Sequence, residues 1–359
     1  MSLIVDKVSR HFNEQLPFVV FRKPNTNRLE AYFQNTNDLF TVSEYSEEGF
    51  VFASFDISKI YIFPKDDCVY ISEIFCPAYV EKEAIKVINP DISLKENHIS
   101  LVQKGIQAIE KQYFEKIVLS RKEEIEVSNF TIEALYLQIA TQYPESYAYC
   151  WYHPKVGLWM GAFSEQLVKV KDTFLETASV AGTQKINPEK AVSWSQKEIK
   201  EQLYVTDFLV SNLQNELETI VVSEPTNMIA GKLVHLKTVI TGTIKETFSL
   251  KNIIALLHPT PAVCGLPKKE AMAFILQNEK YDREFYAGFF GELNCNKLTE
   301  LYVNLRCMKL KFSASSQIQT ATLFMGGGIT KESEPIKEWE ETVQKSQTLK
   351  QILSFKESI

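Results

Sequence analysis

Two stretches of the chain each carry a pair of glutamates three residues apart. Glu198 and Glu201 form the first pair, and Glu338 and Glu341 form the second. On a helix this spacing places both carboxylates on one face, so the two pairs could converge into an oxygen site. Mg²⁺ prefers such a site, with few carboxylates and several waters. The alternative is that both pairs are solvated helix faces.

Two other residues could act as a base and an acid. Lys116 opens the apolar run KIVLSR, and in a strand its side chain would share a face with Val118 and Ser120. Burial there would lower the pKa of the ammonium and make a general base possible. Glu165 follows a run of small residues, and burial would raise its pKa, as a general acid requires. The alternative for Lys116 is an edge lysine that reaches water, and Glu165 alone does not identify a site.

Three features could bind an anion. Lys345 lies four residues beyond Glu341 and could pair with it or reach an anionic substrate. Arg306 stands in an apolar run, where a buried guanidinium needs an anionic partner and suits a carboxylate. The glycines at 326–328 could form a backbone nest for an anion or simply a turn. Their spacing is not that of a P-loop or of a dinucleotide fingerprint.

Two short motifs are structural by themselves. The small residues TASVAGT at 177–183 indicate a tightly packed turn. The segment LHPTPAVCG at 257–265 indicates a rigid loop, in which His258 alone would be a structural residue. From the residues alone we expect an anion-binding, metal-dependent enzyme.

The elements that must position these residues are strands in antiparallel-looking groups between single helices. This pattern favours an α+β sheet sandwich over a regular βαβ series. We expect strands at 17–22, 50–55, 59–63, 68–72, 116–120, 147–152, 156–162, 166–170, 285–293, 299–313 and 318–325, and a hairpin-like region at 220–245. We expect helices at 97–113, 131–142, 193–219, 268–278 and 335–354.

Composition narrows the class of protein. The 359 residues include 39 Lys and Arg against 45 Asp and Glu, and a net charge of −6 argues against a nucleic-acid partner. No apolar run is long enough to span a membrane, and the N-terminus has no signal-peptide pattern. The six cysteines show no zinc spacing and fit a reducing compartment, so we expect a cytoplasmic protein.

Taken together and in order, these segments resemble the chorismate-binding enzyme family. The family includes isochorismate, salicylate, anthranilate and aminodeoxychorismate synthases. The resemblance covers 97–355, with 1–96 as a variable N-terminal part of one domain spanning 1–359. It rests on KIVLSR at 116–121, ASVAGT at 178–183, LHPTPAVCG at 257–265, YDREFYAG at 281–288 and GGGITKESEPIKEWEET at 326–342.

The resemblance implies two packed antiparallel sheets flanked by helices, in four αββα layers, with Mg²⁺ and chorismate as cofactor and substrate. Lys116 resembles the base that activates water, and Glu165 resembles the acid opposite it. Glu201 and Glu341 resemble the direct metal ligands, with Glu198 and Glu338 beside them through water. The substrate-binding positions implied by the resemblance are Ala181, Gly182, Thr183, His235, His258, Ala262, Tyr286, Arg306, Gly326 and Lys345.

Three positions indicate the branch of the family. Ammonia-using members carry Gln at the position of Lys116, and the aminodeoxychorismate branch carries Lys at the position of Ala181, so water is the expected nucleophile. Salicylate synthases carry Thr at the position of Ala262, so we expect an isochorismate synthase that needs no protein partner. The alternatives are a salicylate synthase, an anthranilate synthase large subunit and a non-catalytic chorismate-binding protein. We expect a monomer, because no exposed heptad stands out.

Some positions depart from the family pattern. The family usually has Pro at the position of Ser164 and His at that of Gln202. Phe289-Phe290 replaces the usual Pro-Val, and the segment between Glu165 and Glu201 is short. We expect these departures to affect pocket shape and rate more than the class of reaction.

Overall fold

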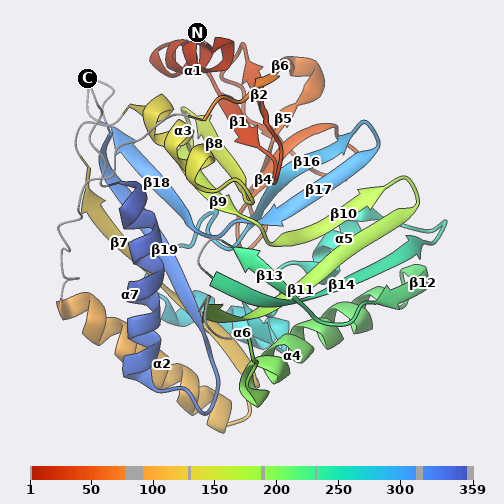
Figure 1. Cartoon of the computed structure of the whole chain (residues 1–359), viewed down its shortest axis with the longest axis vertical. Coiled ribbons are helices and arrows are strands. Elements are labelled where there is room, and N and C mark those ends of the chain that lie inside the picture. The colour runs from red at the N-terminus through yellow and green to blue at the C-terminus, as the bar shows by residue number, and fades with distance from the viewer. Residues whose placement is uncertain are drawn as a thin grey trace.

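Two large antiparallel sheets with flanking helices make up the protein (Figure 1). The computed structural model describes residues 2–77, 92–127, 131–186, 191–230, 233–312 and 318–353. All strand pairs in both sheets are antiparallel, and helices lie between groups of strands along the chain. The expected α+β architecture of two packed antiparallel sheets is confirmed.

The first sheet contains the strand that begins with Lys116. In the described residues its strand order is β15-β7-β19-β18-β9-β8-β1-β2-β6. These strands are β1 (Phe18–Arg22), β2 (Arg28–Gln34), β6 (Cys68–Ile74), β7 (Lys116–Glu126), β8 (Tyr147–His153), β9 (Gly157–Phe163), β15 (Gly265–Leu266), β18 (Cys307–Phe312) and β19 (Ile318–Ile329).

The second sheet has the order β12-β14-β11-β10-β17-β16-β4-β5-β3, with β13 paired to β14. Its strands are β3 (Phe40–Thr41), β4 (Gly49–Ala53), β5 (Ile60–Pro64), β10 (Gln166–Lys171), β11 (Phe174–Lys185), β12 (Leu217–Val222), β13 (Thr226–Ala230), β14 (Leu233–Ile244), β16 (Phe289–Cys295) and β17 (Leu298–Val303). The N-terminal strands therefore enter both sheets, because β1 pairs with β8 and β4 pairs with β16.

Helices cover the sheets on their outer sides. In Figure 1, α2 and α7 lie side by side over β7 and β19, while α4 lies along β11 and β14. The expected boundary at residue 96 falls inside α2. The helices are α1 (Leu3–Asn13), α2 (Ile92–Glu110), α3 (Ile132–Gln142), α4 (Gln196–Leu213), α5 (Leu250–Leu257), α6 (Lys268–Asn278) and α7 (Pro335–Ile352), with a 3₁₀ turn at Lys65–Asp67.

Aromatic side chains fill the space between the sheets. Phe52 of β4 stacks on Trp151 of β8, with ring centroids 4.8 Å apart, and on Phe285, at 4.4 Å. Trp159 of β9 stacks in turn on Phe324 of β19, at 5.3 Å. All but Phe324 are among the largest fully buried side chains of the protein. These rings join strands from distant parts of the sequence into one core.

Three sequence predictions about local structure are wrong. The glycines at 326–328 form neither a nest nor a turn but continue β19, where they pair with Ser120, Leu119 and Val118 of β7. Their backbone groups on the edge that faces β7 therefore belong to a strand ladder. The stretch 177–183 is likewise strand, since it lies in β11 and pairs with β14.

The third correction concerns the strand expected at 299–313. It is broken between β17 and β18, where Arg306 adopts a left-handed φ of 47°. Asn304 stabilises the break, because its side chain accepts a hydrogen bond from Tyr149 and donates one to the carbonyl of Phe285. Helices α1 and α5 were not predicted from the sequence.

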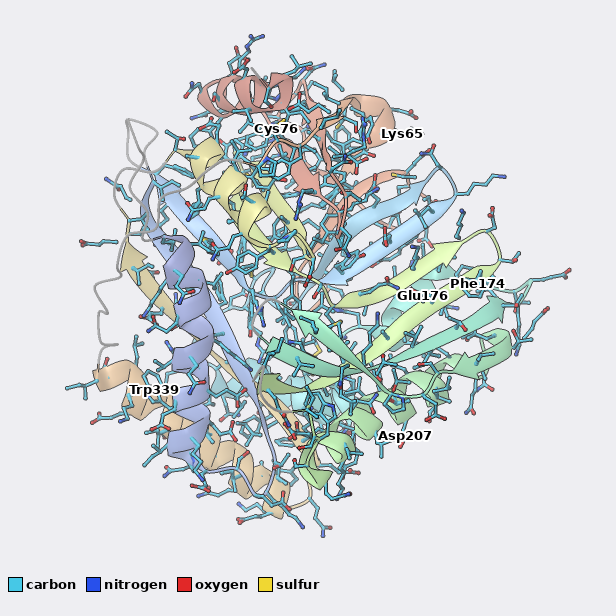
Figure 2. All side chains as sticks on the ribbon, in the orientation of Figure 1. Lys65, Cys76, Phe174, Glu176, Asp207 and Trp339 are labelled. Carbon is cyan, nitrogen blue, oxygen red and sulfur yellow. The ribbon has the colours of Figure 1, made fainter. Side chains whose placement is uncertain are left out.

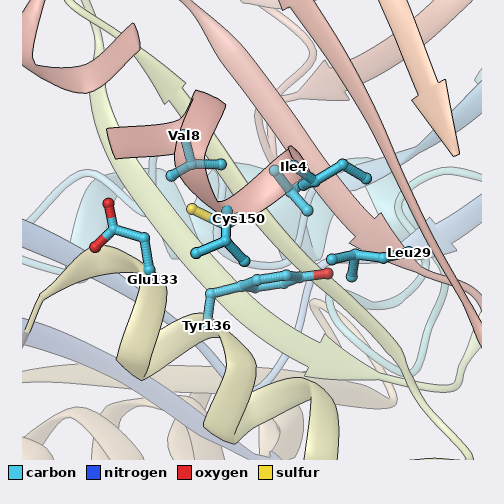
Figure 3. A pocket seen from close by; sticks show the side chains of 8 residues that line it. Ile4, Val8, Leu29, Glu133, Tyr136 and Cys150 are labelled. Carbon is cyan, nitrogen blue, oxygen red and sulfur yellow. The ribbon is translucent and has the colours of Figure 1, made fainter. Parts of the chain in front are cut away.

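A small apolar pocket lies beneath α1, between it and α3 (Figure 3). Ile4, Val8 and Leu29 line it, together with Tyr136 and Cys150. None of the residues singled out for chemistry reaches this pocket, so it belongs to the packing of the first sheet and not to the candidate site.

All six cysteines are free thiols. Within the described ranges, no helix combines the length and the apolar character that crossing a bilayer requires.

We expect the aromatic stack between the sheets to be a main source of stability. Phe52→Ala should lower the free energy of unfolding by about 3–5 kcal/mol, because a fully buried ring leaves a cavity that the two sheets cannot close. Urea unfolding followed by tryptophan fluorescence measures this loss. Phe174→Ala is the matched control, because Phe174 is half exposed (Figure 2) and should change stability by about 0.5 kcal/mol or less. Equal losses in the two variants would contradict the expectation.

Candidate active site

The glycines of β19 separate two groups of charged side chains. A Cβ on Gly328 would lie 3.2 Å from Cε of Lys116, whereas a Cβ on Gly327 would lie 3.4 Å from Oε2 of Glu338 and 3.8 Å from Oε1 of Glu341. Neighbouring residues of a strand face opposite sides, so the amine and the two carboxylates approach the same bare backbone from opposite directions. Only a stretch without side chains allows this approach from both sides.

Helix α7 brings Glu338 and Glu341 to this strand. The guanidinium of Arg121, on β7, lies 4.4 Å from the ring centroid of Trp339, and its Nε donates to Thr342. Trp339 projects from α7 in Figure 2. Since Trp339 and Thr342 sit beside the two glutamates on the helix, these contacts set the rotation of α7 against the sheet.

Lys345 connects the same helix to the glycine strand. Its Nζ donates to the carbonyl oxygen of Gly326 at 2.8 Å and lies 2.7 Å from Oε1 of Glu341. The side chain of Lys345 is 45% exposed, so this cation is open to a ligand. The two partners that the sequence suggested for Lys345 are therefore compatible: it contacts Glu341 and still faces outward.

The pKa values of Lys116 and Glu165 are shifted in opposite directions. Both side chains are buried, at 6% and 8% exposure. Burial lowers the pKa of Lys116, against the opposing effect of Glu201 and Glu165, and Lys345 lowers it further. Burial raises the pKa of Glu165 to about 7, although the charge of Lys116 opposes this shift. Groups of this kind are suited to proton transfer near neutral pH.

Helix α4 positions the other glutamate pair. It begins with a capping box, in which Ser195 accepts from the N–H of Glu198 and the Glu198 carboxylate accepts from the N–H of Ser195. Gln184 of β11 also donates to the carboxylate of Glu198, at 2.9 Å. Glu201 lies one turn further along and close enough to Lys116 to affect its pKa.

Gln202, which replaces the His usual in the family, is buried on the face of α4 that packs on the sheet. Its Nε2 lies within 3.0 Å of the hydroxyls of Ser179, Thr206 and Thr238. Ser179 and Thr238 are opposed in the ladder between β11 and β14. This polar cluster holds Glu201 above the sheet, so the departure from the family pattern leaves α4 anchored.

A bulge in β11 forms another wall. The register between β11 and β14 shifts between Ala181 and Gln184, and Gly182 there has a φ of 72°. The carbonyl oxygen of Gly182 lies 3.1 Å from Nδ1 of His235, on β14. Burial lowers the pKa of His235, and the cations Arg306 and Lys345 lower it further. The side chain of Thr183 lies outside the described residues.

Arg306 and Tyr286 are the other two substrate-binding candidates that the structure describes here. The guanidinium of Arg306 sits 5.2 Å from the centroid of Phe163, and burial lowers its pKa. Tyr286 is buried with its ring stacked on Phe324, and its hydroxyl lies 3.0 Å from the position of a Cβ on Gly326. The site thus gathers Lys345, Arg306 and the polar edge of His235 around a region that suits an anion.

The side chain of His258 contacts the second sheet. Its Nε2 lies 2.9 Å from the carbonyl oxygen of Phe55, and its ring packs against Phe289. Burial lowers its pKa to about 4, so the ring is neutral at physiological pH. These contacts attach the loop to the second sheet. Ala262, further along the loop, is half-buried and packs against the core between the sheets.

The donor chemistry of the glutamates fits Mg²⁺, since all four supply hard carboxylate oxygens from two helices. Across the parts of the chain that are described, however, no three His, Cys, Asp or Glu side chains form a ready ligand cluster. Glu198 accepts from Gln184 and Glu341 pairs with Lys345. Binding a cation would require these carboxylates to turn from their present partners.

Sequence reasoning missed several residues that build the site. The pattern Ser195-x-x-Glu198 is a capping-box signature and could have identified Glu198 as a helix cap. Gln184 carried no local signal, because only the strand pairing brings it to α4. Arg283 belongs to the motif YDREFYAG at 281–288, and Glu279 lies two residues before it. The motif did not predict the buried ion pair that they form beside β7.

Comparison with known proteins identifies the family. The chorismate binding enzyme family matches residues 74–354, which is most of the chain. The chain belongs to the chorismate-binding enzyme family. The resemblance drawn from the motifs is thereby confirmed, and the match begins earlier than the expected residue 97.

Curated relatives of this chorismate-binding enzyme include two from Escherichia coli strain K12. Isochorismate synthase MenF is 27% identical over 273 residues, which is 73% of this chain, and isochorismate synthase EntC is 29% identical over 245 residues, which is 66%. Each match spans 61% of the relative's own length. The solved structure of MenF, the menaquinone-specific isochorismate synthase of Escherichia coli, has the same fold. It aligns with a TM-score of 0.77 at 21% identity, over 94% of this chain and 88% of that one.

The glycine strand gives a direct test of the site. In Gly328→Ala the added methyl would press on Cε of the buried Lys116, so under the function proposed in the next subsection chorismate turnover should fall by about 10–100-fold. Gly327→Ala is the matched variant, because its methyl meets the ends of two glutamate side chains at ordinary contact distance, and its loss should be smaller. Steady-state kinetics with chorismate and urea unfolding of both variants make the comparison. Unchanged turnover in Gly328→Ala would contradict this arrangement.

Proposed function

We propose that this protein is an isochorismate synthase, which adds water at C2 of chorismate and removes the C4 hydroxyl. The observation that carries the proposal is the pair Lys116 and Glu165. Both are buried in one site, with the pKa of the amine lowered and that of the carboxyl raised to about 7. An allylic displacement of one hydroxyl by another needs one base and one acid, and this pair supplies both.

Lys116 is the base. Its uncharged amine takes a proton from a water molecule as the oxygen attacks C2. The ring double bonds shift, and Glu165 gives its proton to the departing C4 oxygen, which leaves as water. Atoms balance, because one water enters and one leaves. The protons that Lys116 gains and Glu165 loses are exchanged with solvent before the next turnover.

The cationic region holds the two carboxylates of chorismate. Arg306 has a planar fork that suits a carboxylate, and Lys345 supplies a more exposed point charge. The lowered pKa of His235 keeps that ring neutral, so it can offer a hydrogen bond without adding charge. Tyr286 and the bulge at Ala181 and Gly182 complete the wall.

Mg²⁺ is the proposed cofactor, with Glu201 and Glu341 as direct ligands and Glu198 and Glu338 beside them through water. When bound, the ion would neutralise a substrate carboxylate and draw charge from the ring. The residues themselves do the remaining work: α4 carries Glu198 and Glu201, α7 carries Glu338 and Glu341, and Glu341 would have to release Lys345 to bind the ion.

Ala262 favours isochorismate over salicylate as the product. A salicylate synthase would go on to expel pyruvate from isochorismate, a rearrangement that depends on the conformer of the side chain in the pocket. The methyl of Ala262 keeps this wall apolar where that branch places a hydroxyl. Lys116, in place of Gln, argues against ammonia as the nucleophile and against anthranilate as the product.

One assay tests the function. The purified protein is incubated with chorismate and Mg²⁺, with and without ammonium, and the products are separated by HPLC while lactate dehydrogenase reports pyruvate. We expect isochorismate, little pyruvate, no ammonium effect, and loss of activity in EDTA that Mg²⁺ restores. Stoichiometric pyruvate would move the assignment to salicylate synthase, and an ammonium requirement would move it to anthranilate synthase. No turnover would leave a chorismate-binding protein without catalysis.

Replacing the base should stop the reaction without unfolding the protein. Lys116→Gln keeps a polar side chain but removes the amine, so kcat should fall by about 10²–10⁴-fold. Chorismate affinity, measured by calorimetry, should change far less because the carboxylate-binding residues remain. Isochorismate formation at the parent rate would exclude Lys116 as the base.

The buried acid should make stability depend on pH. The pKa of Glu165 is raised by burial from 4.5 to about 7, so its contribution to stability is present below pH 4.5 and is lost as pH rises to 7. Glu165→Gln should therefore gain about 3 kcal/mol over the parent between pH 4.5 and pH 8. Urea unfolding at both pH values measures the gain. The exposed Glu145→Gln is the control and should show no such difference.

A further inference from the structure

We propose that Arg283 and Glu279 form a clamp that positions Lys116 against the loop at 258–265. The clamp consists of these two side chains and rests on the proposed role of Lys116 as the base. Both are buried, at 3% and 7% exposure, and Arg283 donates to the two carboxylate oxygens of Glu279 at 2.6 and 2.8 Å. Neither residue contacts the substrate in the proposed reaction, so both are positioning residues.

The clamp replaces a missing neighbour strand along β7. One edge of β7 pairs with β19, whereas on the other edge β15 pairs only with Lys116 and Ile117. The N–H of Val118 still donates to the carbonyl of Cys264 at 2.7 Å, and the clamp supplies the contacts that follow along this edge. Arg283 donates to the carbonyl of Val118 at 2.8 Å, and Glu279 accepts from the N–H and the hydroxyl of Ser120 at 2.7 and 2.9 Å. The strand that carries the base is thereby held on both edges.

The guanidinium of Arg283 also contacts the loop at 258–265. Its Nη1 donates to the carbonyl of Val263 at 2.9 Å, directly after Ala262. The main-chain carbonyl of Arg283 accepts from the N–H of Tyr286, and the guanidinium lies 4.4 Å from the centroid of Phe55. One residue therefore joins the base strand, the Ala262 loop and the turn that leads to Tyr286.

A fork is required at this position. Arg283 reaches Val118 and Glu279 through Nη2, Val263 through Nη1 and Glu279 again through Nε, in a single plane. A lysine keeps the charge but presents one compact ammonium, which cannot reach both carbonyls and both carboxylate oxygens together. A small displacement of Lys116 follows, and displacements of about 1 Å can cost about 100-fold in rate.

The test combines two measurements on the full chain. The variants are Arg283→Lys, which keeps the charge, and the double variant Glu279→Gln with Arg283→Met, which leaves no unpaired buried ion. Glu284→Gln is the matched control: it is adjacent in sequence and ion-paired to Lys309 at 2.6 Å, but the ion pair lies on β18 and not on β7. Hydrogen exchange is followed by mass spectrometry, and kinetics are measured with chorismate and Mg²⁺.

Hydrogen exchange tests the clamp without any activity. We expect at least tenfold faster exchange in peptides covering 116–121 and 258–266 of Arg283→Lys and of the double variant, with α7 unchanged. Glu284→Gln should match the parent. Unchanged exchange in both segments, or an equal increase across the whole chain, would overturn the clamp. This measurement stands even if the protein does not convert chorismate, so failure of the proposed function is separately visible.

Kinetics test whether the clamp acts through Lys116. Arg283→Lys should lower kcat about 10–100-fold with less than about threefold change in KM, because the carboxylate-binding groups stay in place. In a Lys116→Gln background the same substitution should cost less than about twofold, since the group that the clamp positions is gone. Equal losses in both backgrounds would overturn the positioning role.

Discussion

The site depends on the pairing of β7 with a stretch of β19 that has no side chains. Gly326, Gly327 and Gly328 pair with Ser120, Leu119 and Val118, so the ladder with β7 continues through them. The absence of Cβ atoms leaves room for Lys116 on one side and for the carboxylates of α7 on the other. A single strand thus brings a base close to one of its faces and a set of acidic oxygens close to the other.

Burial then sets the chemistry of these groups. Removing Lys116 and Glu165 from water disfavours the charged form of each, which lowers one pKa and raises the other. Such burial costs stability, and the packed aromatic core between the sheets offsets it. Phe52, Trp151 and Phe285 belong to that core and connect β4, β8 and the turn before β16. The stability of the aromatic core therefore offsets the cost of burying the two ionisable groups of the site.

The fixed geometry comes from buried polar contacts that surround the reacting groups. Arg121 fixes α7 through Trp339 and Thr342, and the Gln202 cluster fixes α4 on the second sheet. The pair Arg283 and Glu279 supports the outer edge of β7. Each network draws its partners from elements distant in sequence, so loss of one partner would disturb the placement of a whole helix or strand.

Much of the site was predictable from residue type and spacing. The Glu-x-x-Glu pairs lie on α4 and α7 as expected, because a spacing of three on a helix is a local property. Lys116 opens a strand, as the apolar run KIVLSR indicated, and its burial decides between the two alternatives that the sequence left open. The family resemblance followed from motifs that are local in sequence, and the family match confirms it.

Tertiary structure decided the rest, because it depends on pairing between distant segments. Three glycines in a row are ambiguous locally, and only the ladder with β7 makes 326–328 a strand. The small residues at 177–183 became strand for the same reason, through β14. Gln184, Glu279 and Arg283 acquire roles only when β11 meets α4 and α6 meets β7. The sequence by itself determined which groups could react, whereas the packing of the two sheets decided their distances and their protonation.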